Sequence, residues 1–487
     1  MALDSSIPPA VPQHDTPRTR RPITRTMLAV GAVVMLAGLL FGYDQGVISG
    51  ALDGIKQDFH VSTFLLEVIT SWVTLGAMVG ALVAGGLADR LGRRVTILLA
   101  SGLFTAGAVI EAVAPGSYVL VLGRLVVGFG VGVASVAAPL YAAEMAPARL
   151  PGRFVSLYQL AITIGIFVAY LIDFVLSHAS GWRAMLGVSA VPAVLLVLAV
   201  WPLSDSLRWY MTAARRADAE GALRKVKGVD DVSADLDTIQ ATIDDDAEHE
   251  SGWRTVFAAE WRRPLVIGVA LAVLQQLTGI NAIIYYADQI FAAAGFTSPT
   301  SQSLATLWAV GAVNVVATFV AVVWVDRFGR KPLLFIGTTG MGLSLEVVGA
   351  MFLELPKVAP GGTPHATTGQ GLITLVALVV FIASFAFSLG PIVWTIINEI
   401  FPSHVRGKAV AVATAANWFA AWLVAQFFLS LVSLITTTGV FWVFAAFCAV
   451  TFWFVQRFVP ETKGQSLEQI QSMWGDPTAL AAAMQAE

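Results

Sequence analysis

The chain has 487 residues, of which 57% are hydrophobic and 13% are charged, and its formal net charge is −3. A water-soluble protein of this length could not bury so much apolar surface, so the composition excludes a soluble globular protein and indicates a polytopic membrane protein. The single cysteine, Cys448, excludes an internal disulfide.

Twelve apolar stretches are long enough to cross a bilayer, which takes about 20 mostly apolar residues. In chain order they lie near residues 27–52, 64–88, 95–113, 118–143, 154–177, 183–202, 263–294, 302–325, 333–353, 372–400, 408–436 and 438–457. They predict an all-α membrane protein with 12 transmembrane helices. Of the 29 lysines and arginines, 25 fall on the side that both termini share, and the positive-inside rule makes that side the cytoplasm. We therefore expect a multi-pass protein of the cell membrane with cytoplasmic termini.

The stretches form two groups of six, separated by the longest loop. We expect a cytoplasmic N-terminal tail at 1–26, a six-helix bundle at 27–202, a cytoplasmic linker at 203–262, a second six-helix bundle at 263–457 and a cytoplasmic C-terminal tail at 458–487. The linker begins basic and then turns acidic, which is typical of a solvated segment with short surface helices. In the C-terminal tail, Ser466-Leu467-Glu468-Gln469 has the form of a capping box and predicts another short helix.

An aspartate and an arginine lie inside the predicted helices of the first half. The helical rise places Asp44 and Arg124 about 12 and 9 Å below the outer ends of the first and fourth helices, so the two side chains can meet. A carboxylate in hydrocarbon costs several kcal/mol unless it is paired, protonated or facing water, and it usually marks an ion or proton pathway. Separation of Asp44 from Arg124 could switch the binding of a proton at Asp44 on and off. The alternative is a permanent structural ion pair.

Two motifs recur six helices apart. Asp89-Arg90-Leu91-Gly92-Arg93-Arg94 matches Asp326-Arg327-Phe328-Gly329-Arg330-Lys331, and Glu144-Met145-Ala146-Pro147 matches Glu399-Ile400-Phe401-Pro402. The repetition predicts two pseudo-symmetric halves, a transporter design that holds the substrate near the bilayer midplane. The charges can form ion pairs that close the cytoplasmic side, although arginine clusters can also merely fix topology. The candidate cytoplasmic gate residues are Asp89, Arg93, Glu144, Arg153, Asp326, Arg330, Glu399 and Arg406.

Taken in order, the motifs of the chain resemble the sugar porter family of the major facilitator superfamily, whose fold has 12 transmembrane helices. The resemblance runs from about residue 27 to 470, and it rests on the recurring motifs together with Gly42-Tyr43-Asp44, Gly123-Arg124, Pro139-Leu140-Tyr141-Ala142-Ala143-Glu144, Gln275-Gln276-Leu277-Thr278-Gly279-Ile280-Asn281, Gly390-Pro391-Ile392-Val393-Trp394 and Pro460-Glu461-Thr462-Lys463-Gly464. Two segments depart from the family pattern, Pro151-Gly152-Arg153 and Leu203-Ser204-Asp205-Ser206-Leu207-Arg208-Trp209. Both lie in the gate region of the first half, whereas Arg406-Gly407 keeps the pattern in the second.

A sugar site needs neutral amides, which both donate and accept hydrogen bonds, and aromatic faces for the sugar ring. The helical rise places Gln275, Gln276, Asn314 and Asn417 about 14 to 20 Å deep, near the middle of the bilayer. Gly279 would let the seventh helix loosen beside them. The alternative for each amide is a hydrogen bond between packed helices. The resemblance implies that sugar contacts Gln159, Gln275, Gln276, Asn281, Asn314, Trp394 and Asn417, and that Tyr285 and Tyr286 close over it, with Trp418 as a further candidate.

These observations predict a proton-coupled importer of a monosaccharide, a hexose or a pentose, that works by alternating access. By the resemblance, proton-driven members carry Asp at the position of Asp44, where passive members commonly carry Asn. A passive sugar facilitator, a proton/inositol symporter and a non-transporting sugar sensor stay open. We find no nucleotide-binding loop or metal-spaced His or Cys cluster, so we expect no enzyme, cofactor, metal or nucleic-acid partner. The expected partners of a monomeric protein are a sugar, protons and the lipid bilayer.

Overall fold

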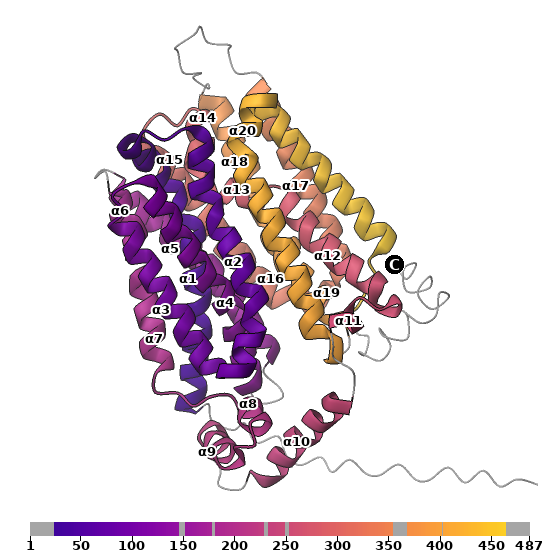
Figure 1. Ribbon diagram of the computed structural model, residues 1–487. Helices are drawn as coiled ribbons and strands as arrows, with labels where there is room; N and C mark the ends of the chain where they lie inside the picture. The colour runs from indigo at the N-terminus through magenta and orange to yellow at the C-terminus, as the bar shows by residue number, and fades with distance from the viewer. Residues whose placement is uncertain are drawn as a thin grey trace, which may run out of the picture.

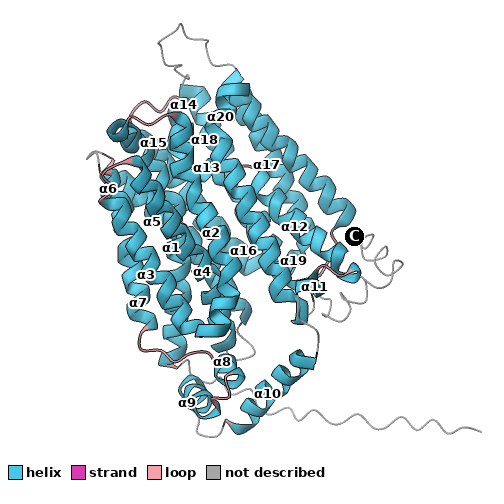
Figure 2. Cartoon of the chain, in the orientation of Figure 1, coloured by secondary structure: helices cyan, strands magenta, loops and turns pink. Residues whose placement is uncertain are grey.

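The computed structural model describes residues 24–145, 151–177, 181–227, 232–248, 253–353, 368–401 and 403–463. Within these ranges the chain is helical and contains no strand (Figure 2). Eleven helical segments there are long and apolar enough to cross a membrane. The last of them includes a break at Thr436 (φ 68°, ψ 163°), and two arms run down from this bend in Figure 1. The chain therefore makes twelve crossings, and the predicted twelve-helix fold is confirmed.

The first half contains six crossings that pack closely through small residues. They are α1 (Arg25–Phe59), α2 (Thr63–Leu91), α3 (Arg93–Ala112), α4 (Ser117–Met145), α5 (Pro151–Leu176), and the pair α6 (Trp182–Val188) and α7 (Ala190–Val200). Helix α1 packs on α5, and α4 packs on both α2 and α3. A Cβ added to Gly128 of α4 would overlap the Val73 carbonyl of α2, because the two backbones nearly touch. Such close approach is typical of transmembrane helices that meet through small residues.

Two crossings of the second half, the seventh and the tenth, are interrupted, and the eighth stays helical through a π-helical stretch. The seventh consists of α12 (Arg262–Leu277), α13 (Ile280–Tyr285) and α14 (Ala287–Ala293), and the eighth of α15 (Pro299–Ala305), the π-helix η2 (Thr306–Ala312) and α16 (Val313–Phe328). The ninth is α17 (Arg330–Leu353), the tenth consists of α18 (Thr368–Phe387) and α19 (Leu389–Glu399), and α20 (Ser403–Phe458) forms the last two. Broken helices of this kind expose backbone groups where they line a cavity.

The break after α12 occurs at the predicted glycine. Gly279 has φ 89°, a left-handed conformation that glycine adopts without the steric cost of a Cβ. A side chain there would also overlap the ring of Phe444. The expectation that Gly279 loosens the seventh helix is therefore confirmed. The further break at Ser388 precedes Gly390 and Pro391, whereas the break at Tyr286 has no glycine or proline to signal it.

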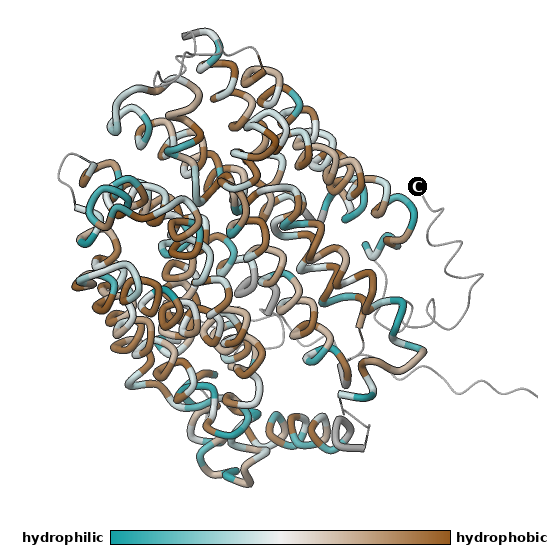
Figure 3. The backbone as a smooth tube through the Cα atoms, turned by 45° about the horizontal axis from the view of Figure 1, so that its top comes forward, coloured by the Kyte–Doolittle hydropathy of each residue, from teal (hydrophilic) through white to brown (hydrophobic). Residues whose placement is uncertain are grey.

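Between the halves, the linker forms short helices at one end of the molecule (Figure 1). These are α8 (Leu207–Thr212), α9 (Arg216–Lys227), α10 (Ser233–Glu248), α11 (Trp253–Val256) and the 3₁₀ turn η1 (Ala259–Trp261). Figure 3 shows that the bundle helices are largely hydrophobic and that hydrophilic residues gather on the linker helices and at the helix ends. The capping box at 466–469 lies outside the described residues, and the assignment of the two halves as separate domains stays a prediction.

Candidate functional site

Three of the predicted amides meet where α12, α19 and α20 come together. Asn417 Nδ2 donates to Gln275 Oε1 at 2.9 Å, and Gln276 Nε2 donates to Asn417 Oδ1 at 3.2 Å. Gln275 Nε2 in turn donates to the carbonyl of Leu389, at 2.7 Å, directly after the break between α18 and α19. Each amide therefore has the interhelical hydrogen bonds that the structural alternative predicts.

One acceptor in this cluster has no partner. Gln276 is 7% exposed, and its Oε1 is buried without a hydrogen bond to any described residue. A buried acceptor that receives no hydrogen bond costs about 1–3 kcal/mol of stability. Gln276 Oε1 therefore favours a ligand with a hydroxyl or amine group that can donate a hydrogen bond to it. The cluster can therefore hold the helices together and still offer an acceptor to a polar ligand.

The other predicted contact residues lie on neighbouring elements. Asn281 on α13 and Asn314 on α16 are both buried, and Gln159 on α5 and Trp394 on α19 are half-buried. Trp418 packs its ring against Phe41 of α1, with centroids 5.3 Å apart, so this aromatic contact joins the two halves. The structure thus brings Gln275, Gln276 and Asn417 into direct contact, and the other predicted residues lie on α5, α13, α16, α19 and α20.

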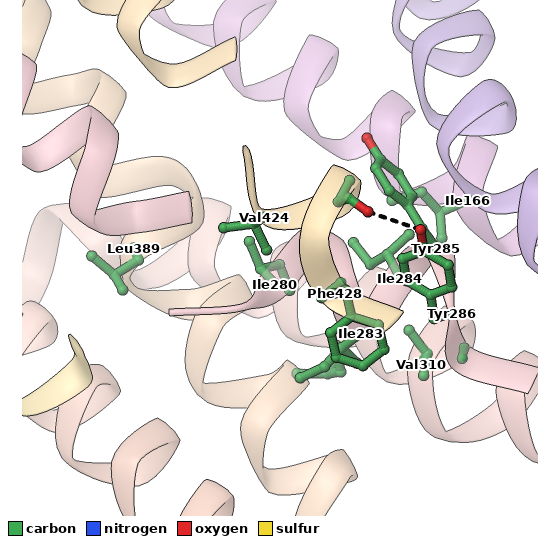
Figure 4. Packing of buried hydrophobic residues seen from close by; sticks show 14 of the residues in the cluster. Ile166, Ile280, Ile283, Ile284, Tyr285, Tyr286, Val310, Leu389, Val424 and Phe428 are labelled. Atoms are coloured by element: carbon green, nitrogen blue, oxygen red, sulfur yellow. Dashed lines mark hydrogen bonds between the residues drawn. The ribbon is translucent and has the colours of Figure 1, made fainter. Parts of the chain in front are cut away.

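The two predicted tyrosines are fully buried at the break between α13 and α14. Tyr286 donates its hydroxyl to the carbonyl of Ala425 at 2.8 Å, and its ring stacks on Phe428 at 4.9 Å. Figure 4 shows Tyr285 and Tyr286 among apolar side chains that include Ile166 of the first half. This layer lies where α13 packs on α1 of the first half and on α20 of the second, and its movement over a ligand stays a prediction.

Asp44 and Arg124 form a buried ion pair. Arg124 Nη1 lies 2.7 Å from Asp44 Oδ1, with the two residues 0% and 3% exposed. The guanidinium is held further because its Nε donates to the carbonyl of Ile69 at 3.2 Å. The pair that the helical rise allows is therefore formed across α1 and α4, and the coupling role assigned to it stays a prediction.

A second carboxylate, which sequence reasoning missed, lies beside this pair. Glu111 of α3 is 1% exposed, and its Oε1 lies 3.8 Å from Arg124 Nη1. The signal in the sequence was a lone acid inside the third apolar stretch. The sequence could not show that this acid faces α4.

At the cytoplasmic ends, the recurring motifs form equivalent ion pairs in the two halves. Arg93 lies 2.9 Å from Glu144 and 3.2 Å from Asp89, and Arg330 lies 2.9 Å from Glu399. The Arg93 pair is formed although the neighbouring segments depart from the family pattern. Each of these pairs joins helices of one half.

The remaining predicted gate residues contribute less to the described contacts. The side chains of Arg153 and Asp326 lie outside the described residues. Arg406 Nε donates to the carbonyl of Phe401 at 3.1 Å, which is a backbone contact and not an ion pair with a carboxylate. The gate role of these three residues stays a prediction.

Two further acids, which sequence reasoning did not assign, cap the helices that follow the Asp-Arg motifs. Asp205 Oδ1 accepts from the backbone N–H of Arg93 at 2.8 Å, at the start of α3. Glu461 accepts from the backbone N–H groups of Arg330 and Lys331 at 3.1 and 2.9 Å, at the start of α17. A carboxylate is stabilised there by the unpaired N–H groups and the helix dipole. Asp205 lies within one of the departing segments, so that segment still supplies a capping acid.

Hydrogen bonds between the halves lie toward the end opposite the linker. Ser71 of α2 donates to Gln426 of α20 at 2.8 Å, and Glu67 of α2 accepts from the backbone and hydroxyl of Ser430 at 2.7 and 2.6 Å. Near them, the backbone N–H of Asp288 donates to the Ser49 hydroxyl at 3.0 Å. By the predicted topology this is the outer side, and these bonds hold it closed. The two halves diverge toward the linker in Figure 1.

Comparison with known proteins gives a consistent assignment. The family described as Sugar (and other) transporter matches residues 30–474. The galactose-proton symporter of Escherichia coli (strain K12) is 40% identical over 442 residues, covering 90% of this chain and 92% of that protein. The arabinose-proton symporter of the same strain is 38% identical over 462 residues, covering 94% and 95%. A solved structure, the partially occluded inward open conformation of the xylose transporter XylE from E. coli, has a TM-score of 0.77 at 30% identity, covering 91% of this chain and 99% of that one.

Proposed function

This chain belongs to the sugar transporter family of the major facilitator superfamily, and from that premise we propose that it imports a monosaccharide together with a proton by alternating access. The relatives named as galactose-proton and arabinose-proton symporters support a hexose or a pentose as the sugar. The observation that carries the proposal is the buried Asp44–Arg124 pair, together with an amide cluster whose buried acceptor has no partner among the described residues.

The proton acts at Asp44. With the outer side open, a proton on Asp44 removes the charge that holds Arg124, and the guanidinium is then free to change partners. A protonated carboxyl no longer needs a buried cation, so the halves can move relative to each other at a lower electrostatic cost. Coupling requires only that the proton and the sugar each favour the same conformational change.

The sugar binds at the amides between the halves. A sugar hydroxyl can donate to Gln276 Oε1, which is buried and accepts no hydrogen bond from the described part of the chain. Other hydroxyls exchange with the bonds that Asn417 makes to Gln275 and Gln276, because these amides can both donate and accept. Binding therefore replaces bonds between helices with bonds to the sugar, which links occupancy of the site to the arrangement of α12 and α20.

The cytoplasmic ion pairs regulate access from the inside. In the arrangement described, Arg93–Glu144 and Arg330–Glu399 each lie within one half. The hydrogen bonds between the halves are on the outer side, as expected for an inward-facing state. When the halves rock, the same charged helix ends come together and close the cytoplasmic side.

Transport by the purified protein in liposomes tests this proposal. Labelled D-xylose and D-galactose are offered with an inward proton gradient, without a gradient, and with a gradient plus a protonophore. We expect accumulation above the external concentration only with an intact gradient. Equilibration at the same rate in all three conditions would replace the proposal with a passive facilitator, and absence of any sugar movement would favour a sensor. Competition by hexoses, pentoses and polyols then identifies the preferred sugar.

A further inference from the structure

Glu111 is placed so that it can replace Asp44 as the partner of Arg124. Its Oε1 lies 3.8 Å from Arg124 Nη1, the same nitrogen that lies 2.7 Å from Asp44 Oδ1. At 3.8 Å the contact is an ion pair but not a hydrogen bond. Glu111 Oε1 and Arg124 Nη2 are both buried without a hydrogen-bond partner among the described residues. A shift of about 1 Å would turn this contact into a charge-assisted hydrogen bond.

The packing of α3 on α4 makes room for this side chain. A Cβ added to Gly123 would lie within overlap distance of Glu111 Cγ, and a Cβ on Gly107 would overlap Val127. The two glycines let the helix backbones approach, and the Glu111 side chain occupies the space that a larger residue at 123 would fill. The carboxylate therefore lies beside Arg124 because of the helix packing.

The charges around Arg124 do not balance if both acids are ionised. Asp44 from α1 and Glu111 from α3 face one guanidinium from α4, and all three side chains are at most 5% exposed. Tyr285 from α13 is the other titratable group near Arg124, and Arg183 from α6 binds the Ala114 carbonyl just beyond the end of α3. Two buried carboxylates on one cation attract a proton more strongly than a single carboxylate does.

We propose that Glu111 is a positioning residue of the proton site, which takes Arg124 as its partner when Asp44 receives the transported proton. The inference rests on the proposed proton coupling and adds to it. Without Glu111, protonation of Asp44 would leave Arg124 as a buried cation with only the Ile69 carbonyl and no anion beside it, which is a costly state. With Glu111 ionised, protonation of Asp44 changes the net charge of the three side chains Asp44, Glu111 and Arg124 from −1 to 0. Arg124 keeps an anionic partner throughout.

The test compares the pH dependence of sugar binding to the purified wild type and to Glu111→Gln. The measured quantity is the pH at which binding of D-xylose or D-galactose is half-maximal. Removing the Glu111 charge leaves Asp44 as the only anion on Arg124, so Asp44 keeps its charge to lower pH. We expect the midpoint to move toward acid by about one pH unit or more, with sugar exchange retained. An unchanged midpoint in folded, exchange-active Glu111→Gln overturns the proposal.

Two further variants keep the result decisive. Glu346→Gln removes an exposed glutamate of α17 in the other half, and we expect it to keep the wild-type midpoint. Glu111→Asp keeps the negative charge but places it farther from Arg124, because the side chain is one methylene shorter. The midpoint of this variant should therefore also move toward acid, but by less than that of Glu111→Gln. If Glu111→Gln does not fold, Glu111→Asp decides, and a wild-type midpoint in that variant overturns the proposal. If the wild type itself shows no proton-driven uptake, the proposed function fails, which is a separate outcome from an unshifted variant.

Discussion

Asp205 and Glu461 have the same structural role in the two halves of the molecule, since each carboxylate accepts backbone N–H groups at the start of the helix that follows an Asp-Arg motif. Asp205 belongs to the linker after the sixth crossing, and Glu461 follows the twelfth. The acid that caps α3 or α17 thus comes from the segment that follows the last crossing of its own half. This relationship extends the internal repeat to contacts that the motifs themselves do not contain.

Replacing either capping acid should destabilise its own half. Asp205→Ala and Glu461→Ala each leave N–H groups at a helix start without a partner, which costs about 1 kcal/mol. We expect each variant to lower the Tm of the detergent-solubilised protein by a few degrees. Asp218→Ala is the matched control, because the contact that its side chain makes within the described residues is an exposed ion pair with Arg215 on the linker. A loss of stability in the control equal to that in the variants would contradict the capping role.

Asp44→Asn should separate sugar movement from proton coupling. The amide fits the space of the carboxylate but cannot accept a transported proton. We expect concentrative uptake to be abolished and exchange of sugar between the two sides of the membrane to continue. Counterflow and gradient-driven uptake are measured on the same liposomes. Continued accumulation by this variant would show that the coupling proton binds elsewhere.

Gln276→Ala should weaken sugar binding. The substitution removes the buried acceptor without a partner and the bond to Asn417. One lost hydrogen bond to a sugar hydroxyl costs about 1.4 kcal/mol, which corresponds to roughly a tenfold increase in Kd. Gln240→Ala on the linker helix α10, where the side chain binds Asp244, should leave the Kd unchanged. If the Kd of Gln276→Ala equals that of wild type, this amide only joins helices.

The twelve crossings were predictable from the sequence because the bilayer sets the length of an apolar run. The meeting of Asp44 and Arg124 followed from the helical rise, which fixes depth along each helix. The rise does not reveal which face of a helix packs on which neighbour. For that reason, the contact of Glu111 with Arg124 and the network of Gln275, Gln276 and Asn417 needed the structure. The break at Ser388 has a local cause, because Pro391 cannot donate the helical hydrogen bond to Phe387. The break at Tyr286 has no glycine or proline beside it, so tertiary packing determines it.

Gly279→Ala should damage the site through the backbone. Its φ of 89° is unfavourable for alanine, and the added methyl would overlap the Phe444 ring. We expect a lower Tm and a loss of sugar binding, with a destabilisation of at least about 1 kcal/mol. Gly268→Ala lies in the same crossing, and its added Cβ would make only ordinary contacts at 3.6 Å or more. The control should keep both properties, and equal damage in the two variants would refute the special role of position 279.

A reversible crosslink between Ser71 and Gln426 should lock the outer side closed. These side chains are hydrogen-bonded at 2.8 Å across α2 and α20, so cysteines at both positions would be within reach of a short bifunctional thiol reagent that contains a reducible disulfide. The only native cysteine, Cys448, is buried, which keeps background reaction low. Alternating access requires the outer contact to open in every cycle, so the reagent should stop uptake by the double variant and a reductant should restore it. Each single cysteine variant cannot form the crosslink and should keep its uptake. Full uptake by the crosslinked protein would mean that these helices do not separate during transport.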